Sequence, residues 1–236
     1  RVELDRKRQQ QQVEREQDQR RKHKTAAERG HAILNAGVPA VDHPYLRRKN
    51  VRAHPGLRIG RWPQRNMNGC LLIPLRRIDG TLATVQAIFP EKGTGARDKD
   101  FLAGGEKRGA HFVIGDPETA DVIAIGEGYA TCATIHEATG FCSVMAVDAG
   151  NLLPVAQAFR AAYPAKPIII AADNDRNTEG NPGLTKASAA AKAVGAALAC
   201  PEFAEGEPGS DFNDMAGLHG LDAVRDAIAR TEEPAP

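Results

Sequence analysis

The chain has 236 residues, of which 42% are hydrophobic and 26% are charged, and its net charge is +1. That composition is typical of a folded globular protein and excludes a wholly disordered or fibrous chain. No apolar run approaches the roughly 18–20 residues that a membrane-spanning helix needs, so the sequence predicts no transmembrane segment.

The small net charge conceals an uneven distribution. Residues 1–120 hold 24 basic and 14 acidic side chains, a net charge of +10, whereas residues 121–236 hold 7 and 16, a net charge of −9. A basic half favours a polyanionic partner, and ordinary solvated surface on both halves is the alternative interpretation.

The cysteines indicate a reducing compartment. They show no Cys-x-x-Cys pair and stand apart at Cys70, Cys132, Cys142 and Cys200. This spacing argues against a zinc ribbon or a disulfide framework and favours a cytoplasmic protein with reduced thiols. Because the chain opens at Arg1 with a charged run and no apolar signal, we expect a segment of a longer polypeptide without a secretory signal.

The first half of the chain is predicted to hold one helix and a β-rich region. Residues 1–25 are almost all charged or Gln and predict a linker or an exposed lone helix. Residues 26–37 predict a helix that ends at Gly37. Beyond it, strands are predicted at Cys70–Leu75, Thr81–Ile88 and His111–Ile114, the first two joined by a hairpin turn at Asp79-Gly80.

After Asp116-Pro117 the pattern changes to strands that alternate with helices. The predicted strands are Asp121–Ile125, Ser143–Val147, Pro167–Ala172 and Ala196–Cys200. The predicted helices are Tyr129–Thr139, Leu152–Tyr163, Thr185–Val194 and Leu221–Arg230. Such alternation is typical of βαβ units, so we expect an α/β fold with a mostly parallel sheet and helices on both faces. We therefore divide the chain into a charged linker or exposed helix (1–25), a basic N-terminal subdomain (26–118) and an α/β domain (119–236).

Carboxylates follow three of the predicted strands. They are Glu127 within Gly126-Glu127-Gly128, Asp173 and Asp175 within Asp-Asn-Asp, and Asp211 and Asp214 after the last strand. Because the functional crevice of an open α/β sheet lies beyond the carboxyl ends of its strands, we expect these groups to meet at one edge. Divalent cations with oxygen ligands would remove their mutual repulsion, and two such ions can promote phosphoryl transfer. An acidic residue in such a place is also a common helix N-cap, and Asp148 is interpreted as one.

This order of motifs resembles the Toprim domain, the fold shared by topoisomerases, bacterial-type primases and some nucleases. The resemblance rests on the apolar strand that leads into Gly-Glu-Gly (Val122–Gly128), on Asp173-Asn174-Asp175 and on the later acidic pair. It implies that Glu127 binds a metal or handles a proton, and that Asp173 and Asp175 bind Mg²⁺ or Mn²⁺. Asp211 and Asp214, spaced Asp-x-x-Asp, take the place of the third acidic motif as further metal ligands.

The upstream half resembles the basic part of plasmid- and phage-type DNA primases. The matching motifs are Asn68–Pro74, Lys99-Asp100-Phe101-Leu102 with Gly104-Gly105, and His43-Pro44-Tyr45-Leu46 with Arg47-Arg48-Lys49. Together with the acidic motifs, the likeness spans about residues 30–230. It implies the catalytic core of a DNA-directed RNA polymerase that makes short RNA primers on single-stranded DNA by Mg²⁺-dependent nucleotidyl transfer. Any zinc module of such a primase would precede Arg1.

The primase resemblance also implies roles for basic residues and partners. Lys99 is expected to act in catalysis, and nucleotide or template contacts are expected from Lys99, Lys107, Arg108 and Lys186. The implied partners are nucleoside triphosphates, a single-stranded DNA template and a replicative helicase, fused or separate, with no membrane. Two alternatives stay open: a metal-dependent nuclease on the same fold, and a non-catalytic DNA-binding module of a replication or conjugation protein.

Overall fold

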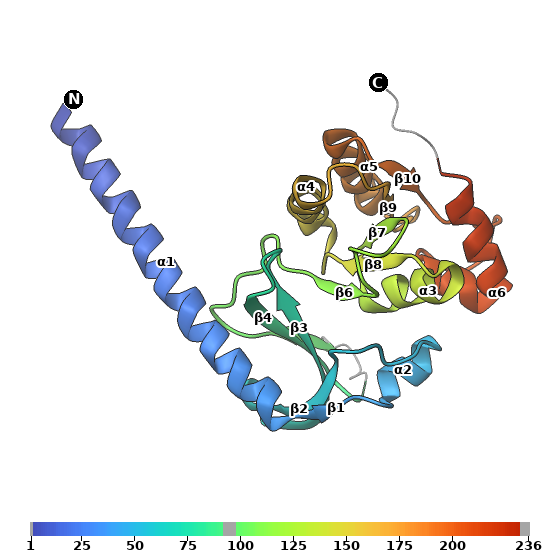
Figure 1. Ribbon diagram of the computed structural model, residues 1–236, viewed down its shortest axis with the longest axis horizontal. Helices are drawn as coiled ribbons and strands as arrows, with labels where there is room; N and C mark the ends of the chain where they lie inside the picture. The colour runs from blue at the N-terminus through green and yellow to red at the C-terminus, as the bar shows by residue number, and fades with distance from the viewer. Residues whose placement is uncertain (1, 92–97, 232–236) are drawn as a thin grey trace.

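The computed structural model describes residues 2–91 and 98–231, and places them in two five-stranded sheets and six α-helices (Figure 1). A mixed α/β fold with an N-terminal helix is therefore confirmed. Within these residues, no helix combines the length and apolar character needed to cross a membrane.

The N-terminal helix α1 is one continuous element, Val2–Ala36. The helix predicted over residues 26–37 is thus present and extends back through the charged start. Its contact with the rest of the molecule is limited to its last part, where Ala26 and Leu34 are buried and Gly30 lies close to Leu82 and Val85. The preceding turns project away from the sheets (Figure 1), as expected from their scarcity of apolar residues.

The first sheet is antiparallel, in the order β1-β2-β3-β4-β5. Its strands are β1 (Val38–Pro39), β2 (Arg58–Trp62), β3 (Met67–Arg76), β4 (Leu82–Ile88) and β5 (Lys99–Phe101). The predicted hairpin is confirmed, since Leu71 pairs with Ile88 and Leu75 with Thr84. At its turn, Gly80 has φ +81° and the Asp79 carboxylate accepts a bond from the Thr81 amide (2.9 Å), the local geometry that an Asp-Gly turn favours.

The second sheet has the order β10-β9-β7-β8-β6. It consists of β6 (Phe112–Ile114), β7 (Ile123–Gly126), β8 (Cys142–Met145), β9 (Ile168–Ala171) and β10 (Ala197–Ala199). Strands β7 to β10 are parallel to their neighbours, and the edge strand β6 runs antiparallel to β8. The mostly parallel sheet predicted from the alternating pattern is therefore confirmed.

Helices cover both faces of this sheet. The helices are α3 (Tyr129–Thr139), α4 (Leu152–Ala162), α5 (Pro182–Val194) and α6 (Phe212–Ala229). Ile123 and Ile125 of β7 point into a core shared with α4 and α5, whereas Ala124 between them joins the core under α3 and α6. The helix predicted over 221–230 begins earlier than expected, because α6 starts at Phe212 and breaks at Gly220 (φ +84°).

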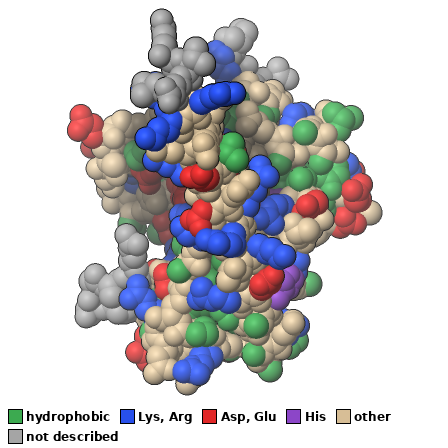
Figure 2. Space-filling view, turned by 90° about the vertical axis from the view of Figure 1, so that its left-hand side faces the viewer, with side chains coloured by type: hydrophobic (Ala, Val, Ile, Leu, Met, Phe, Trp, Pro, Cys, Tyr) green, Lys and Arg blue, Asp and Glu red, His purple; other side chains and the backbone are tan. Residues whose placement is uncertain are grey.

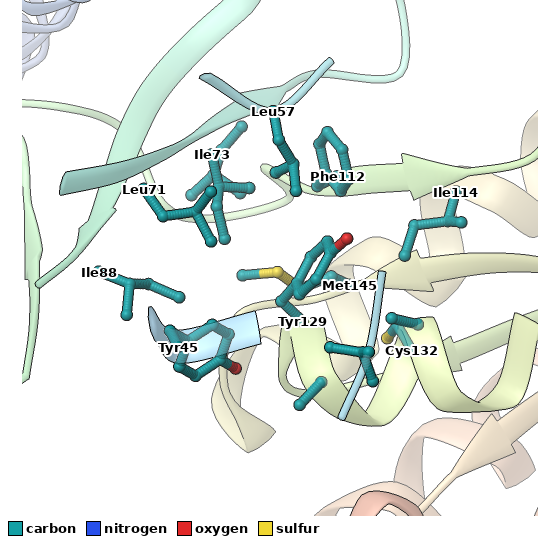
Figure 3. Packing of buried hydrophobic residues seen from close by; sticks show 14 of the residues in the cluster. Tyr45, Leu57, Leu71, Ile73, Ile88, Phe112, Ile114, Tyr129, Cys132 and Met145 are labelled. Atoms are coloured by element: carbon teal, nitrogen blue, oxygen red, sulfur yellow. The ribbon is translucent and has the colours of Figure 1, made fainter. Parts of the chain in front are cut away.

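A shared apolar cluster joins the two sheets. Leu71, Ile73 and Ile88 of the first sheet pack against Phe112 and Met145 of the second, with Tyr129 at the centre (Figure 3). The short helix α2 (Pro44–Lys49) adds Tyr45 to the same cluster (Figure 3). The cluster therefore fixes the basic half of the chain against the acidic half.

The cap of α2 explains one motif of the sequence. The side chain of His43 accepts a hydrogen bond from the Tyr45 amide through Nδ1 (3.1 Å). Its other ring nitrogen lies 2.9 Å from the Gly69 carbonyl, to which Nε2–H donates in this tautomer. His43 is thus a structural cap that positions the cationic turn Arg47-Arg48-Lys49 of α2.

Candidate active site

Glu127 lies immediately after strand β7, where the chain turns into helix α3. Gly128 is the N-cap of that helix, and an added Cβ on Gly126 would lie 3.2 Å from the Cys132 sulfur. The backbone at Gly126 therefore packs closely against helix α3. Glu127, the next residue, lies at the carboxyl edge of the sheet. One of its oxygens, Oε1, is buried and has no hydrogen-bond partner.

Asp173 and Asp175 follow the neighbouring parallel strand β9. Asn174 between them is anchored, because its amide donates to the Ser210 carbonyl (2.6 Å) and its side-chain nitrogen to the Pro201 carbonyl (3.0 Å). Asp175 Oδ2 accepts a hydrogen bond from the Gly183 amide at the start of α5 (3.1 Å). Asp173 Oδ1 is buried without a partner, as is Oε1 of Glu127.

Asp211 and Asp214 lie at the start of α6. Asp211 is the N-cap, and its Oδ1 accepts a bond from the Asp214 amide (2.8 Å). Asp214 Oδ2 accepts a bond from the Ser210 amide (3.1 Å), while its Oδ1 lies 3.5 Å from Lys49 Nζ. Part of the acceptor capacity of both carboxylates is therefore used within the protein.

The carboxylates of these loops influence one another electrostatically. The pKa of Asp173 is raised to about 8, first by burial and then by the charges of Glu127, Asp211, Asp175 and Asp214. Burial also raises the pKa of Glu127 to about 7, together with the charges of Asp175 and Asp148. All five predicted carboxylates thus belong to one electrostatic cluster at the carboxyl edge of the sheet.

The carboxylate oxygens at this edge of the sheet are candidate ligands for a metal ion. Among the residues of the described ranges, no three or more His, Cys, Asp or Glu side chains form a ready-made group of ligands. The two buried oxygens without partners, on Glu127 and Asp173, nevertheless fit a cation. Mg²⁺ is commonly bound by only one or two carboxylates, with waters and substrate phosphates as the other ligands. The residues therefore fit an ion that is completed by its substrate, and not a preformed protein cage.

Two lysines flank the acidic cluster. Lys107 Nζ lies 3.7 Å from Asp148 Oδ2 and 4.7 Å from the centre of the Phe101 ring. Lys186, exposed in the second turn of α5, lowers the pKa of Glu127 through its charge. The structure thus places both lysines beside the carboxylates, where they can attract an anionic substrate.

The other predicted basic residues lie further out. Lys99 is exposed on the edge strand β5, with Nζ 5.9 Å from the centre of the Tyr45 ring. The pKa of Tyr45 is raised, first by burial and then by the charge of Asp211, so this ring is within electrostatic reach of Asp211. Arg108 is exposed next to Lys107.

The sequence interpretation missed three residues near the cluster. Asp148, interpreted as a helix cap, makes no side-chain capping bond and instead faces Lys107 and Glu127. Lys49 contacts Asp214, and the buried Asn213 donates to the Lys49 carbonyl (2.7 Å) and to Thr134 Oγ1 (2.9 Å). Asp148 follows strand β8 and could have been found by the rule that identified Glu127. Lys49 belongs to the Arg47-Arg48-Lys49 motif, but no sequence signal indicated its contacts with Asp214 and Asn213, because these partners are far apart in the chain.

Comparisons with known proteins match part of the chain to a known domain family. Residues 122–222 match the model of the Toprim domain family. The chain is 41% identical over 231 residues to DNA primase TraC of Escherichia coli, which covers 91% of this chain. The chain spans only 21% of the length of that relative.

The similar solved structures are also parts of primases. The DnaG primase catalytic domain bound to single-stranded DNA superposes with a TM-score of 0.63 and 12% identity, covering 90% of this chain and 80% of that one. The zinc-binding and RNA polymerase domains of the Aquifex aeolicus primase give a TM-score of 0.55 and 11% identity, over 80% of this chain and 55% of that one. At such low identity these two likenesses establish the fold alone.

Proposed function

Since residues 122–222 form a Toprim domain and the chain as a whole is similar to part of a DNA primase, we propose that it is the catalytic core of a primase that synthesises short RNA primers on single-stranded DNA. The observation that supports this most is the pair of buried, partnerless carboxylate oxygens on Glu127 and Asp173, at the ends of two adjacent parallel strands. Such a pair is costly in its ionised form unless a cation binds there.

The carboxylates have distinct parts in this proposal. Asp173 and Asp175 would hold Mg²⁺ or Mn²⁺ together with Glu127, while Asp211 and Asp214 would serve as outer ligands or orient the inner ones. When bound, the metal would supply positive charge against the phosphate oxygens of the transition state. Glu127 would share this metal or take the proton of the attacking 3′-hydroxyl, and without a bound metal its pKa is raised to about 7, mainly by burial.

The basic residues would position the anionic substrates. Lys107 and Lys186 flank the carboxylates and would contact the triphosphate, and Lys99 and Arg108 would contact nucleotide or template further out. The proposed partners are nucleoside triphosphates and single-stranded DNA, with a replicative helicase, fused or separate, as a further partner. The four cysteines are free thiols, in keeping with action in the cytoplasm.

The test is incorporation of labelled ribonucleotides on single-stranded DNA in the presence of Mg²⁺ or Mn²⁺. We expect short RNA products from the wild type. In Asp173→Ala and Glu127→Ala the rate of synthesis should fall by at least about a hundredfold, since removing one group that stabilises charge in a transition state has an effect of that size. Asp121→Ala, at an exposed position just before β7, is the matched control and should keep wild-type activity.

The same assay separates the alternatives. Metal-dependent loss of template without RNA products would indicate a nuclease and refute the primase proposal. Salt-sensitive DNA binding with neither synthesis nor cleavage would indicate a binding module and refute it equally.

A further inference from the structure

Helix α1 presents a row of cations that the catalytic cluster does not use. Arg8, Arg15, Lys22 and Arg29 follow one another at intervals of seven residues, and all four are exposed. Seven residues fall about 20° short of two full turns, so the four side chains lie along one gently drifting stripe. We refer to these four residues as the α1 cation row. At about 1.5 Å per residue the row is about 31 Å long.

The row is poor in neutralising carboxylates. Within the described side chains, Arg8, Arg15 and Arg29 have no acidic group at ion-pair distance, and Lys22 pairs with Asp18 (2.6 Å). Figure 2 shows many Lys and Arg side chains, with some Asp and Glu among them, on the side of the molecule along which α1 runs. A row of four exposed cations, three of which have no ion-pair partner among the described side chains, is suited to a chain of phosphates.

The row also leads toward the catalytic cluster. Its inner end, Lys22 and Arg29, lines a hollow with Ala103 and Gly104, and the Gly104 backbone packs against Lys22 and Ala26. The same loop continues to Lys107, which faces Asp148 beside Glu127. Cations are thus found from the acidic cluster, through the loop after β5, to the far end of α1.

The opposite side of α1 differs in its surroundings. Arg20 and Lys24 face a hollow that also contains Glu28 and Glu106, and Glu106 is already paired with Arg77 (2.6 Å). Arg6 lies on the same side by helix geometry. This side therefore places two carboxylates, those of Glu28 and Glu106, among its cations, whereas the only carboxylate at ion-pair distance from the α1 cation row, within the described side chains, is that of Asp18.

We propose that the α1 cation row binds the phosphate backbone of the DNA strand that extends beyond the catalytic cluster, as a second nucleic-acid contact outside it. The inference deepens the proposed function and rests on it for the identity of the strand. The row is as long as about nine phosphate steps of one strand in duplex geometry, at about 3.4 Å per step, and spans fewer steps of a more extended single strand. It predicts that α1 contributes to the binding of long templates and not of short ones.

The test compares two triple variants with equal charge loss. The row variant is Arg8→Gln, Arg15→Gln and Arg29→Gln, and the control is Arg6→Gln, Arg20→Gln and Lys24→Gln on the opposite side of the same helix. Helical content by circular dichroism should match the wild type in both, because Gln is a good helix former. Binding is measured by fluorescence anisotropy with oligodeoxythymidines of about 8 and about 30 nucleotides, between 50 and 200 mM salt.

For the longer oligonucleotide we plot the logarithm of the binding constant against the logarithm of the salt concentration. We expect the magnitude of this slope to be smaller by about 2 in the row variant, since each of the three lost phosphate contacts contributes about 0.7. Between 50 and 200 mM salt the wild-type affinity should then fall about 20-fold more than that of the row variant. The control should keep the wild-type slope, and all three proteins should bind the shorter oligonucleotide alike.

Two results would overturn the inference: a row variant with the wild-type slope, or an equal loss of slope in the control. Failure of the proposed function is recognised separately. If the wild type makes no primers but binding still depends on the row and on template length, the inference holds and the primase proposal falls. If primers are made and the row variant binds like the wild type, the inference falls alone.

Discussion

Neutralising Asp173 should make the metal-free protein more stable at alkaline pH. The pKa of Asp173 is raised from 3.8 to about 8 in the folded protein, mainly by burial and next by the charge of Glu127. The folded state therefore retains a proton that the unfolded state has lost, and stability falls as the pH rises from about 4 to about 8. Asp173→Asn removes this ionisation, so the advantage of the variant must grow over the same pH range.

The size of the effect follows from the shift. At about 1.4 kcal/mol per pKa unit, the raised pKa lowers the free energy of unfolding by roughly 5–6 kcal/mol once Asp173 is fully ionised in the folded state. Roughly 1.6 kcal/mol of this loss is already present at pH 5, because Asp173 is ionised in the unfolded state at that pH. The remaining difference of about 4 kcal/mol between pH 5 and pH 9 is reduced by buffer cations and by movement of the loop carboxylates. We therefore expect the variant to gain about 2–3 kcal/mol on the wild type between these two pH values.

Urea denaturation in EDTA at pH 5 and pH 9, followed by circular dichroism, measures this difference. Asp121→Asn, an exposed carboxylate just before the same sheet, is the control and should show no pH-dependent gain. Adding Mg²⁺ or Mn²⁺ at pH 9 should stabilise the wild type and leave the variant unchanged, because a ligand stabilises only the state that binds it. A gain that is absent, or equal at both pH values, would show that Asp173 is not the buried, repelled carboxylate described above.

Three further changes test the scaffold around the site. Gly183→Ala should destabilise the protein by about 1–3 kcal/mol and reduce primer synthesis, because the new Cβ would lie 2.6 Å from the Asp173 carbonyl oxygen. Urea denaturation measures the first effect and the primer-synthesis assay the second. Ile73→Ala should cost about 2–5 kcal/mol in urea denaturation through the cavity left in the cluster between the sheets, whereas Ile78→Ala at the exposed hairpin turn should cost less than about 0.5 kcal/mol. Burial lowers the pKa of His111, so below about pH 6.5 the unfolded state binds a proton that the folded state does not, and the melting temperature falls. In His111→Asn the melting temperature should fall less over the same pH range.

The parts of the fold that sequence reasoning predicted are those with a local signal. The alternation after Asp116 predicts every strand of the parallel sheet to within two residues at each end, and α3 is predicted at its observed bounds, Tyr129–Thr139. Strands β1, β2 and β5 and helix α2 were not predicted. They are short, and their stability comes from partners distant in sequence: β5, for instance, is defined by its pairing with β4 through Gln86 and Phe101.

The candidate site shows the same limit at the level of side chains. The position after a parallel strand is a local property, so Glu127, Asp173 and Asp175 could be identified from the order of motifs alone. Lys107 is also named from the sequence and Lys49 belongs to a named motif, but their contacts with Asp148 and Asp214 could not be predicted, because they form only when the two sheets pack together. Tyr45 and Tyr129 meet in that packing, and both sheets contribute to the same buried cluster (Figure 3). A charge count that separates a basic half from an acidic half therefore describes the two sides of one site, joined by an apolar contact that no charge pattern reveals.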